Sequence, residues 1–280
     1  MVIIKLIRPL NCLMTAIAVW VGAYLTEGYG LNLDVVLAAL AASGVAAAAY
    51  IQNDILDFQI DLIAHPDRVL VSGLVPIRNA GIWAATALAV GLVCAALVGP
   101  WAAITACVAT VMLALYNSYL KRVPLIGNLT IGLVAALPFI LGGLTVNSSK
   151  LLTLPGALVP ATFAVLFHLV REIIKDIQDM SGDRAAGVIT LPQLVGVRPA
   201  ASIALLLFVL LDLQILVPVY QDWYSQTYTI LAVAGVIVPL TASLIYTAIN
   251  PTVARLAWCS NALKVGMVIG MLALVLGRLP

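Results

Sequence analysis

Long stretches of mostly apolar residues recur along this chain, and several reach the roughly 20 residues that a helix needs to cross the hydrocarbon layer of a membrane. Residues 79–98 and 228–249, for example, contain no charged side chain. Only 9% of the 280 residues are charged, whereas soluble domains carry roughly 25%. This excludes an ordinary water-soluble protein and predicts an all-α, polytopic protein of the cell membrane.

The breaks between these stretches are marked by proline, glycine and charged residues, and they predict nine transmembrane helices in a single domain over residues 1–280. The nine predicted helices are 10–27, 33–52, 79–98, 101–119, 125–146, 154–174, 200–220, 228–249 and 260–278. Alanine and glycine are frequent in them, and small residues allow membrane helices to approach closely. We therefore expect a compact helical bundle.

The basic residues fall almost entirely on one side of this topology. Twelve of the 14 Lys and Arg residues lie at the N-terminus or in loops on its side, and only Lys150 and Arg278 lie on the other. The positive-inside rule makes the crowded side cytoplasmic, with the N-terminus inside and the C-terminus outside. The net charge of +2 gives no indication of nucleic-acid binding. We expect membrane lipids and membrane-soluble molecules as partners.

Two aspartate clusters with the same spacing, DxxDxxxD, lie where predicted helices run into polar loops. They are Asp54, Asp57 and Asp61 in NDILDFQID, and Asp176, Asp179 and Asp183 in DIQDMSGD. In a helix, positions i, i+3 and i+7 share a face. Each cluster is therefore expected to direct three carboxylates the same way. The even number of predicted helices between the clusters places both on the cytoplasmic side.

Carboxylates crowded at a membrane boundary repel one another and lose hydration, so they require a positive partner. Mg²⁺ suits such sites because it takes oxygen ligands and completes its shell with water and substrate phosphate. A single DxxD also occurs as a helix cap or a solvated loop, but two matching copies favour a functional site. The cation site of an ion-coupled transporter is the competing interpretation, although such sites usually lie near the bilayer midplane on broken helices.

The two aspartate motifs, on nine predicted helices, resemble the UbiA superfamily of intramembrane prenyltransferases over essentially the whole chain. The resemblance implies a ring of nine helices around a central cavity, capped on the cytoplasmic side by the two aspartate loops. It also implies that Mg²⁺ holds the diphosphate of a polyprenyl donor. The six aspartates would then be catalytic, and Asp54, Asp57, Asp176 and Asp179 would ligate the metal.

Further strings are similar to an archaeal-type branch of that family, whose members transfer a geranylgeranyl group from geranylgeranyl diphosphate to geranylgeranylglyceryl phosphate. These strings are IRPLN (7–11), AHPDRVLVSG (64–73), YNSYLKR (116–122), GNLTIGLVAALPFILGG (127–143), REIIKDIQDMSGD (171–183) and GVITLP (187–192). This branch would make the glyceryl ether phosphate the acceptor. An aromatic quinone precursor is the alternative acceptor.

Six further residues are predicted to bind the substrates: Asn53, Arg68, Tyr116, Lys121, Lys175 and Asn11. The cations would hold phosphate oxygens, and the Tyr116 ring would stabilise an allylic cation. The alternatives are a membrane-surface anchor for Lys121, packing for Tyr116 and a hydrogen bond to a neighbouring helix for Asn11. Asp212, within an apolar stretch, has no predicted role.

Overall fold

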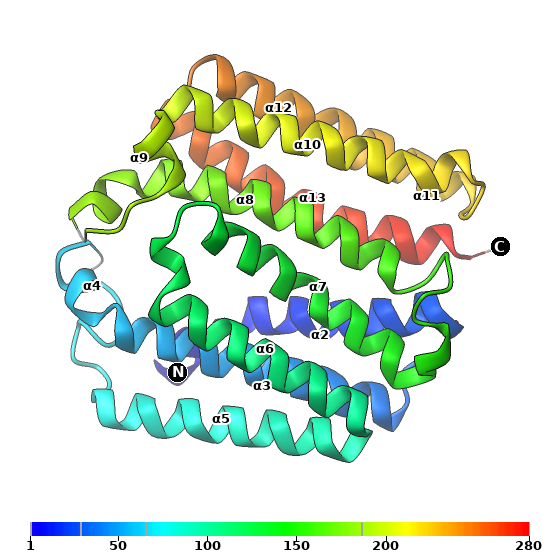
Figure 1. Cartoon of the computed structure of the whole chain (residues 1–280), viewed down its shortest axis with the longest axis horizontal. Coiled ribbons are helices and arrows are strands. Elements are labelled where there is room, and N and C mark those ends of the chain that lie inside the picture. Colours follow the sequence, from blue (N-terminus) through cyan, green and yellow to red (C-terminus); the bar gives the residue numbers. More distant parts are fainter. Residues whose placement is uncertain (1, 29, 65, 186, 280) are drawn as a thin grey trace. The chain divides into compact units, whose positions relative to one another are not determined.

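The computed structural model describes residues 2–28, 30–64, 66–185 and 187–279, and its regular elements in these ranges are all helical (Figure 1). The long helices are α2 (Pro9–Glu27), α3 (Leu33–Leu56), α5 (Ile77–Val98), α6 (Pro100–Ser118), α7 (Ile126–Asn147), α8 (Leu158–Ala185), α10 (Val197–Tyr220) and α13 (Val253–Gly277). Between α10 and α13, α11 (Gln226–Ala232) and α12 (Val238–Ile249) are joined by a π-helical turn, Val233–Ile237. The short elements are α1 (Val2–Ile7), α4 (Phe58–Ala64), α9 (Leu191–Val195) and two 3₁₀ turns, Leu120–Arg122 and Ser148–Lys150.

Eight helical segments in the described residues are long and apolar enough to span a membrane. They are the long helices named above except α8, together with Gln226–Ile249, which comprises α11, the π-helical turn and α12. The all-α membrane architecture is thereby confirmed, but the count of nine stays a prediction. The remaining predicted span, 154–174, falls largely in α8, which starts at Leu158 and continues through the second aspartate cluster. The last predicted span was also placed too late, because α13 already begins at Val253, where Thr252 caps its N-terminus.

The chain folds as two compact units. The first comprises the residues up to Leu120 together with Leu137–Ala157, and the second comprises Lys121–Ala136 together with the residues from Leu158 onward. Helix α7 contributes its first half to the second unit and its second half to the first. One domain over residues 1–280 stays a prediction.

In the first unit, α3 packs against α2, α5 and α6, and it runs beside α5 in Figure 1. Glycines allow this close approach. A Cβ atom on Gly44 would lie 2.7 Å from the carbonyl oxygen of Ala87, and one on Gly91 would lie 2.9 Å from that of Ala41. The predicted packing through small residues is confirmed for this helix pair.

The C-terminal end of α3 anchors two further segments of the first unit. Buried Ile51 of α3 belongs to one hydrophobic cluster with Leu6 of α1 and with Val69, Leu70 and Val75 of the loop before α5. This cluster fixes α1 and the loop beside the helix end that carries Asp54.

In the second unit, α10 packs against α8 and α12, and α13 packs against α8, α11 and α12. Asp212 of α10, which had no predicted role, is buried and accepts a hydrogen bond of 2.6 Å from the hydroxyl of Thr241 in α12. It therefore links two helices of this unit.

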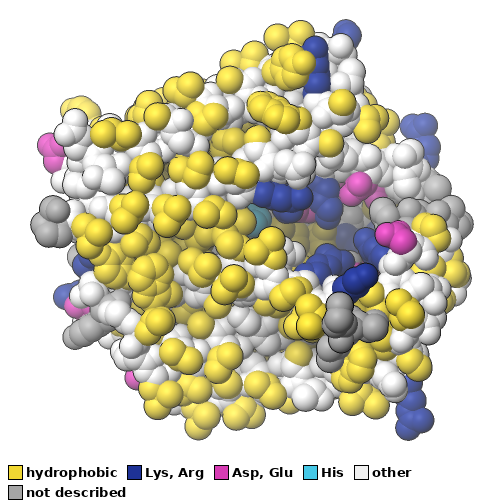
Figure 2. Space-filling model, turned by 180° about the vertical axis from the view of Figure 1, so that it is seen from behind, with side chains coloured by type: hydrophobic (Ala, Val, Ile, Leu, Met, Phe, Trp, Pro, Cys, Tyr) yellow, Lys and Arg dark blue, Asp and Glu magenta, His cyan; other side chains and the backbone are white. Residues whose placement is uncertain are grey.

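Hydrophobic side chains cover much of the molecular face in Figure 2. Val93 and Leu97 on α5, and Leu206 and Leu213 on α10, are each more than half exposed. Exposed apolar side chains on long helices are expected where lipid, and not water, is the surrounding solvent. The surface agrees with an integral membrane protein.

Candidate active site

The first aspartate cluster lies across the junction of α3 and α4 and not on one uninterrupted helix. Asp57 is the residue at the break, and its N–H donates to the carbonyl of Asn53. The N–H of Asp61 in turn donates to the carbonyl of Asp57 at 2.8 Å, which is a helical hydrogen bond across the break. The helical spacing is thereby kept, and Asp54 and Asp61 share a face as predicted.

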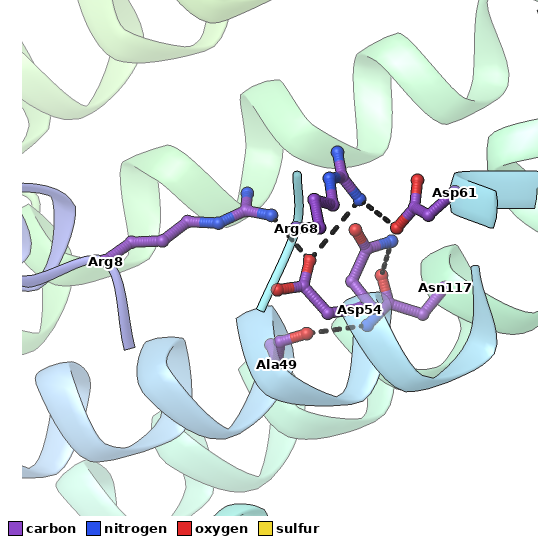
Figure 3. Close-up of polar contacts among 7 residues, drawn as sticks. Arg8, Ala49, Asp54, Asp61, Arg68 and Asn117 are labelled. Carbon is purple, nitrogen blue, oxygen red and sulfur yellow. Dashed lines mark hydrogen bonds and ion pairs between the residues drawn. The ribbon is translucent and has the colours of Figure 1, made fainter. Parts of the chain in front are cut away.

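Arg68 joins these two aspartates (Figure 3). Its Nη1 lies 2.5 Å from Oδ2 of Asp61 and 3.5 Å from Oδ1 of Asp54. Both carboxylates are buried, with residue exposures of 3% for Asp61 and 8% for Asp54. Arg68 was predicted to bind substrate phosphate, and in this structure its guanidinium neutralises the carboxylates.

Arg8 is a second cation at Asp54, and it was missing from the predicted site residues. Its Nη2 lies 2.8 Å from Oδ1 of Asp54 (Figure 3). Its guanidinium carbon lies 5.0 Å from the centre of the Tyr50 ring. Arg8 lies in the string IRPLN (7–11), just before the first predicted helix, but no role was predicted for it.

A chain of amides continues the site toward α6. Asn53 donates to Oδ1 of Asn117 at 3.3 Å, and Asn117, which is buried, donates to the carbonyl of Ala49 at 3.1 Å. Asn117 was not predicted as a site residue, although its neighbour Tyr116 was. Tyr116 lies half-buried in the last turn of α6.

The second aspartate cluster lies on a single helix, α8, as predicted. Asp176 accepts a hydrogen bond of 2.8 Å from the side-chain amide of Asn128, a buried residue of α7 within the same unit. Burial raises the pKa of Asp176 to about 7; the negative charges of Glu172 and Asp183 add to the effect and the Asn128 bond opposes it. Asp176 and Asp183 therefore act on each other, as residues seven apart on one helix face should. Asp179 is exposed.

The other predicted substrate-binding residues lie at exposed or half-buried positions. Lys175 of α8 is half-exposed, and its Nζ lies 3.8 Å from Glu172, which also pairs with Arg171 at 3.0 Å. Lys121 is half-buried in the Leu120–Arg122 turn. Asn11 is exposed on the first turn of α2.

The donor atoms of the two clusters fit Mg²⁺ in chemical type. They are carboxylate and amide oxygens, which are the ligands that Mg²⁺ prefers. Within the described residues no three His, Cys, Asp or Glu side chains are already assembled around a common point. Asp54 is instead paired with arginines, and burial raises the pKa of Asp176 to about 7. A cation that brings its own water and phosphate ligands would stabilise the ionised form of buried Asp176.

Comparison with known proteins adds independent information. Residues 14–276 match the model of the UbiA prenyltransferase family. The digeranylgeranylglyceryl phosphate synthase of Methanopyrus kandleri is 32% identical over 274 residues, with 96% of each chain covered.

Two solved structures have the same fold. One, described as giving insights into digeranylgeranylglyceryl phosphate synthase in membranes, is 28% identical with a TM-score of 0.78 and covers 99% of this chain and 97% of its own. The other is a UbiA homologue from Archaeoglobus fulgidus bound to GPP and Mg²⁺; it is 19% identical with a TM-score of 0.68 and covers 98% of this chain and 99% of its own.

Proposed function

Because this chain belongs to the UbiA prenyltransferase family, we propose that it transfers a geranylgeranyl group from geranylgeranyl diphosphate to the hydroxyl of geranylgeranylglyceryl phosphate. Family membership makes the protein a membrane prenyltransferase. The choice of substrates is supported by the similarity, over nearly the full length of both chains, to a protein named digeranylgeranylglyceryl phosphate synthase. The observation that carries the proposal for the site is the buried group of Asp54, Asp61 and Arg68.

We assign binding of Mg²⁺ to Asp54, Asp57, Asp176 and Asp179, with Asp61 and Asp183 in support. Mg²⁺ would supply positive charge that stabilises the leaving diphosphate. The support for a metal is the oxygen donor set of both clusters and the Mg²⁺ bound to the Archaeoglobus fulgidus homologue. In the first cluster Arg68 pairs with Asp61 and orients it, while Asn53 is positioned by Asn117.

In the proposed reaction, the bond between the first prenyl carbon and the diphosphate oxygen breaks, and its electron pair leaves with the diphosphate. Arg68, Lys121 and Lys175 hold the phosphate oxygens that gain this charge. The Tyr116 ring faces the allylic cation, and Asn11 orients the acceptor. The acceptor hydroxyl then forms the new C–O bond and gives its proton to a carboxylate or to the diphosphate. Apolar surroundings exclude water that would quench the cation.

The sidedness of the reaction follows from the distribution of basic residues. We propose that the N-terminus and the active site face the cytoplasm and that the C-terminus lies outside, because 12 of the 14 basic residues fall on the N-terminal side of the predicted topology.

The test is product formation by the purified protein in detergent with Mg²⁺, geranylgeranyl diphosphate and geranylgeranylglyceryl phosphate. Mass spectrometry should detect a doubly prenylated glyceryl phosphate, and EDTA should abolish it. Product with an aromatic quinone precursor alone would reassign the acceptor. If neither acceptor reacts and sealed vesicles take up substrate unchanged, an ion-coupled transporter replaces the enzyme.

A matched pair of variants tests the aspartates. Asp54→Asn should lose turnover, while Asp34→Asn, the same change in the exposed first turn of α3, should keep it. Size-exclusion chromatography shows whether both variants remain folded. Full activity in a folded Asp54→Asn variant would remove the first cluster from the mechanism.

A further inference from the structure

We propose that Arg8 exchanges partners during the catalytic cycle: it neutralises Asp54 while no metal is bound, and it binds a phosphate group of a substrate once a metal ion takes that carboxylate. This inference rests on the proposed function, because it assumes that Asp54 is a metal ligand.

The ion pairs at Asp54 show which of its two arginines is released. Oδ1 of Asp54 lies 2.8 Å from Arg8 and 3.5 Å from Arg68, so two guanidinium groups share one oxygen. Arg68 has a closer partner in Asp61, at 2.5 Å. Among the described residues, Arg8 has an ion pair with Asp54 alone. A divalent cation on Asp54 would repel both arginines, but Asp61 keeps Arg68 in place, so Arg8 is the one that leaves.

The backbone of Arg8 is fixed. Arg8 precedes α2 in the left-handed conformation (φ 51°, ψ 67°), which L-residues seldom adopt. Its carbonyl accepts the N–H groups of Asn11 and Cys12, and the carbonyl of Cys12 accepts the hydroxyl of Ser43. Uncommon backbone conformations held by their surroundings concentrate at functional sites. The side chain, 35% exposed, is the part that can move.

The Tyr50 ring provides a surface along which the guanidinium can turn. The ring lies 5.0 Å from the Arg8 guanidinium carbon, within the range of a cation–π interaction. A guanidinium carries five N–H donors, so groups not bonded to Asp54 remain available beside the ring. Arginine binds phosphate through two parallel N–H···O bonds. A guanidinium held beside the Tyr50 ring can therefore pass from a carboxylate to a phosphate without losing its aromatic partner.

Partner exchange predicts effects of opposite sign on metal and phosphate binding. With Mn²⁺ as a spectroscopic substitute for Mg²⁺ and no phosphate present, Arg8→Gln should bind the metal about fivefold more tightly, because a competing ion pair is gone. With the metal saturating, the same variant should bind phosphate about tenfold more weakly, because a charge-assisted contact is lost. Electron paramagnetic resonance measures free Mn²⁺, and calorimetry measures phosphate binding.

Two phosphate probes separate the possible sources of the group. Inorganic pyrophosphate stands for the donor, and glycerol 1-phosphate stands for the acceptor. The probe whose affinity Arg8→Gln lowers identifies the substrate that Arg8 holds. If neither affinity falls, the proposal is overturned.

Matched variants exclude a merely structural role. Arg78→Gln removes an exposed arginine at the start of α5 and should change neither affinity. Arg8→Lys keeps the charge but not the paired N–H groups, so metal affinity should stay near wild type and phosphate affinity should fall. This variant also serves if Arg8→Gln does not fold.

Weaker binding of both metal and phosphate would make Arg8 structural and overturn the exchange. Absence of Mn²⁺ binding to the wild-type protein would overturn the proposed metal site as well.

Discussion

The side-chain amide of Asn128 donates a hydrogen bond of 2.8 Å to Asp176, across two helices of the second unit. The bond favours the charged form of a carboxylate whose pKa burial has already raised to about 7. Replacing Asn128 with Leu should therefore raise the pKa of Asp176 further.

Metal binding reports this shift, because a carboxylate must lose its proton to ligate Mg²⁺. In Asn128→Leu, the pH midpoint of Mn²⁺ affinity should move upward from that of the wild-type protein. Asn261→Leu, a change at an exposed position of α13, is the control and should leave the midpoint unchanged. Identical midpoints in all three proteins would show that the Asn128 bond does not tune the site.

The raised pKa of Asp176 also predicts how stability depends on pH. An ordinary aspartate has a pKa of 3.8, and Asp176 in the folded metal-free protein has a pKa of about 7. The folded state thus binds the proton more tightly than the unfolded state. This contribution to stability is complete below the unfolded pKa and is lost as the pH rises through the folded pKa.

Thermal unfolding in EDTA measures that contribution as the difference in Tm between the wild-type protein and Asp176→Asn. The neutral amide has no proton to lose, so the Tm of the wild-type protein should fall relative to that of Asp176→Asn as the pH rises from about 4 to about 8. A difference that stays constant over this range would mean that Asp176 carries no raised pKa.

Asp61 and Arg68 should be energetically coupled. Their atoms are in direct contact and Asp61 is buried. Asp61→Asn and Arg68→Gln should therefore each lower the free energy of unfolding more in the wild-type protein than in a protein that already carries the other substitution. A double-mutant cycle of unfolding free energies should give a coupling energy of about 1–3 kcal/mol. Additive effects would mean that the pair contributes no mutual stabilisation.

Close packing of α3 and α5 should make Gly91 intolerant of a side chain. Gly91→Ala would place its Cβ 2.9 Å from the Ala41 carbonyl oxygen, so the helices would have to separate, at a cost of about 1–3 kcal/mol. Gly81→Ala, on the same helix with no atom within 4 Å of the added Cβ, should stabilise by about 0.5–1 kcal/mol. Chemical denaturation compares the two, and equal effects would contradict the packing argument.

The helices could be predicted from hydropathy because crossing a bilayer requires long apolar stretches without unsatisfied backbone groups. The predicted helix bounds were least accurate where charged residues lie within a helix. Helix α8 continues to Ala185 although Arg171, Lys175 and three aspartates interrupt its apolar character. Helix α13 begins seven residues before its predicted start, because the Thr252 cap, and not hydropathy, sets that end.

The aspartates could be predicted because a repeated charge motif is rare in an apolar chain. Arg8, Asn117 and Asn128 could not be assigned to the site in the same way, because a single polar residue near the end of an apolar stretch has many uses. Their contacts depend on tertiary structure: Arg8 reaches Asp54 across 46 positions of sequence, and Asn128 reaches Asp176 across 48. No local spacing indicates such pairs.

A helical hydrogen bond bridges the break at Asp57. The relative orientation of Asp54 and Asp61 therefore depends on the number of residues between them more than on the identity of those residues. One inserted residue would rotate Asp61 by about 100° around the helix axis and away from Arg68. Substitutions at the outward-facing positions of this stretch, such as Leu56 or Gln59, leave that rotation unchanged. Sequence divergence across this junction should therefore take the form of replacements, whereas insertions and deletions should accumulate elsewhere.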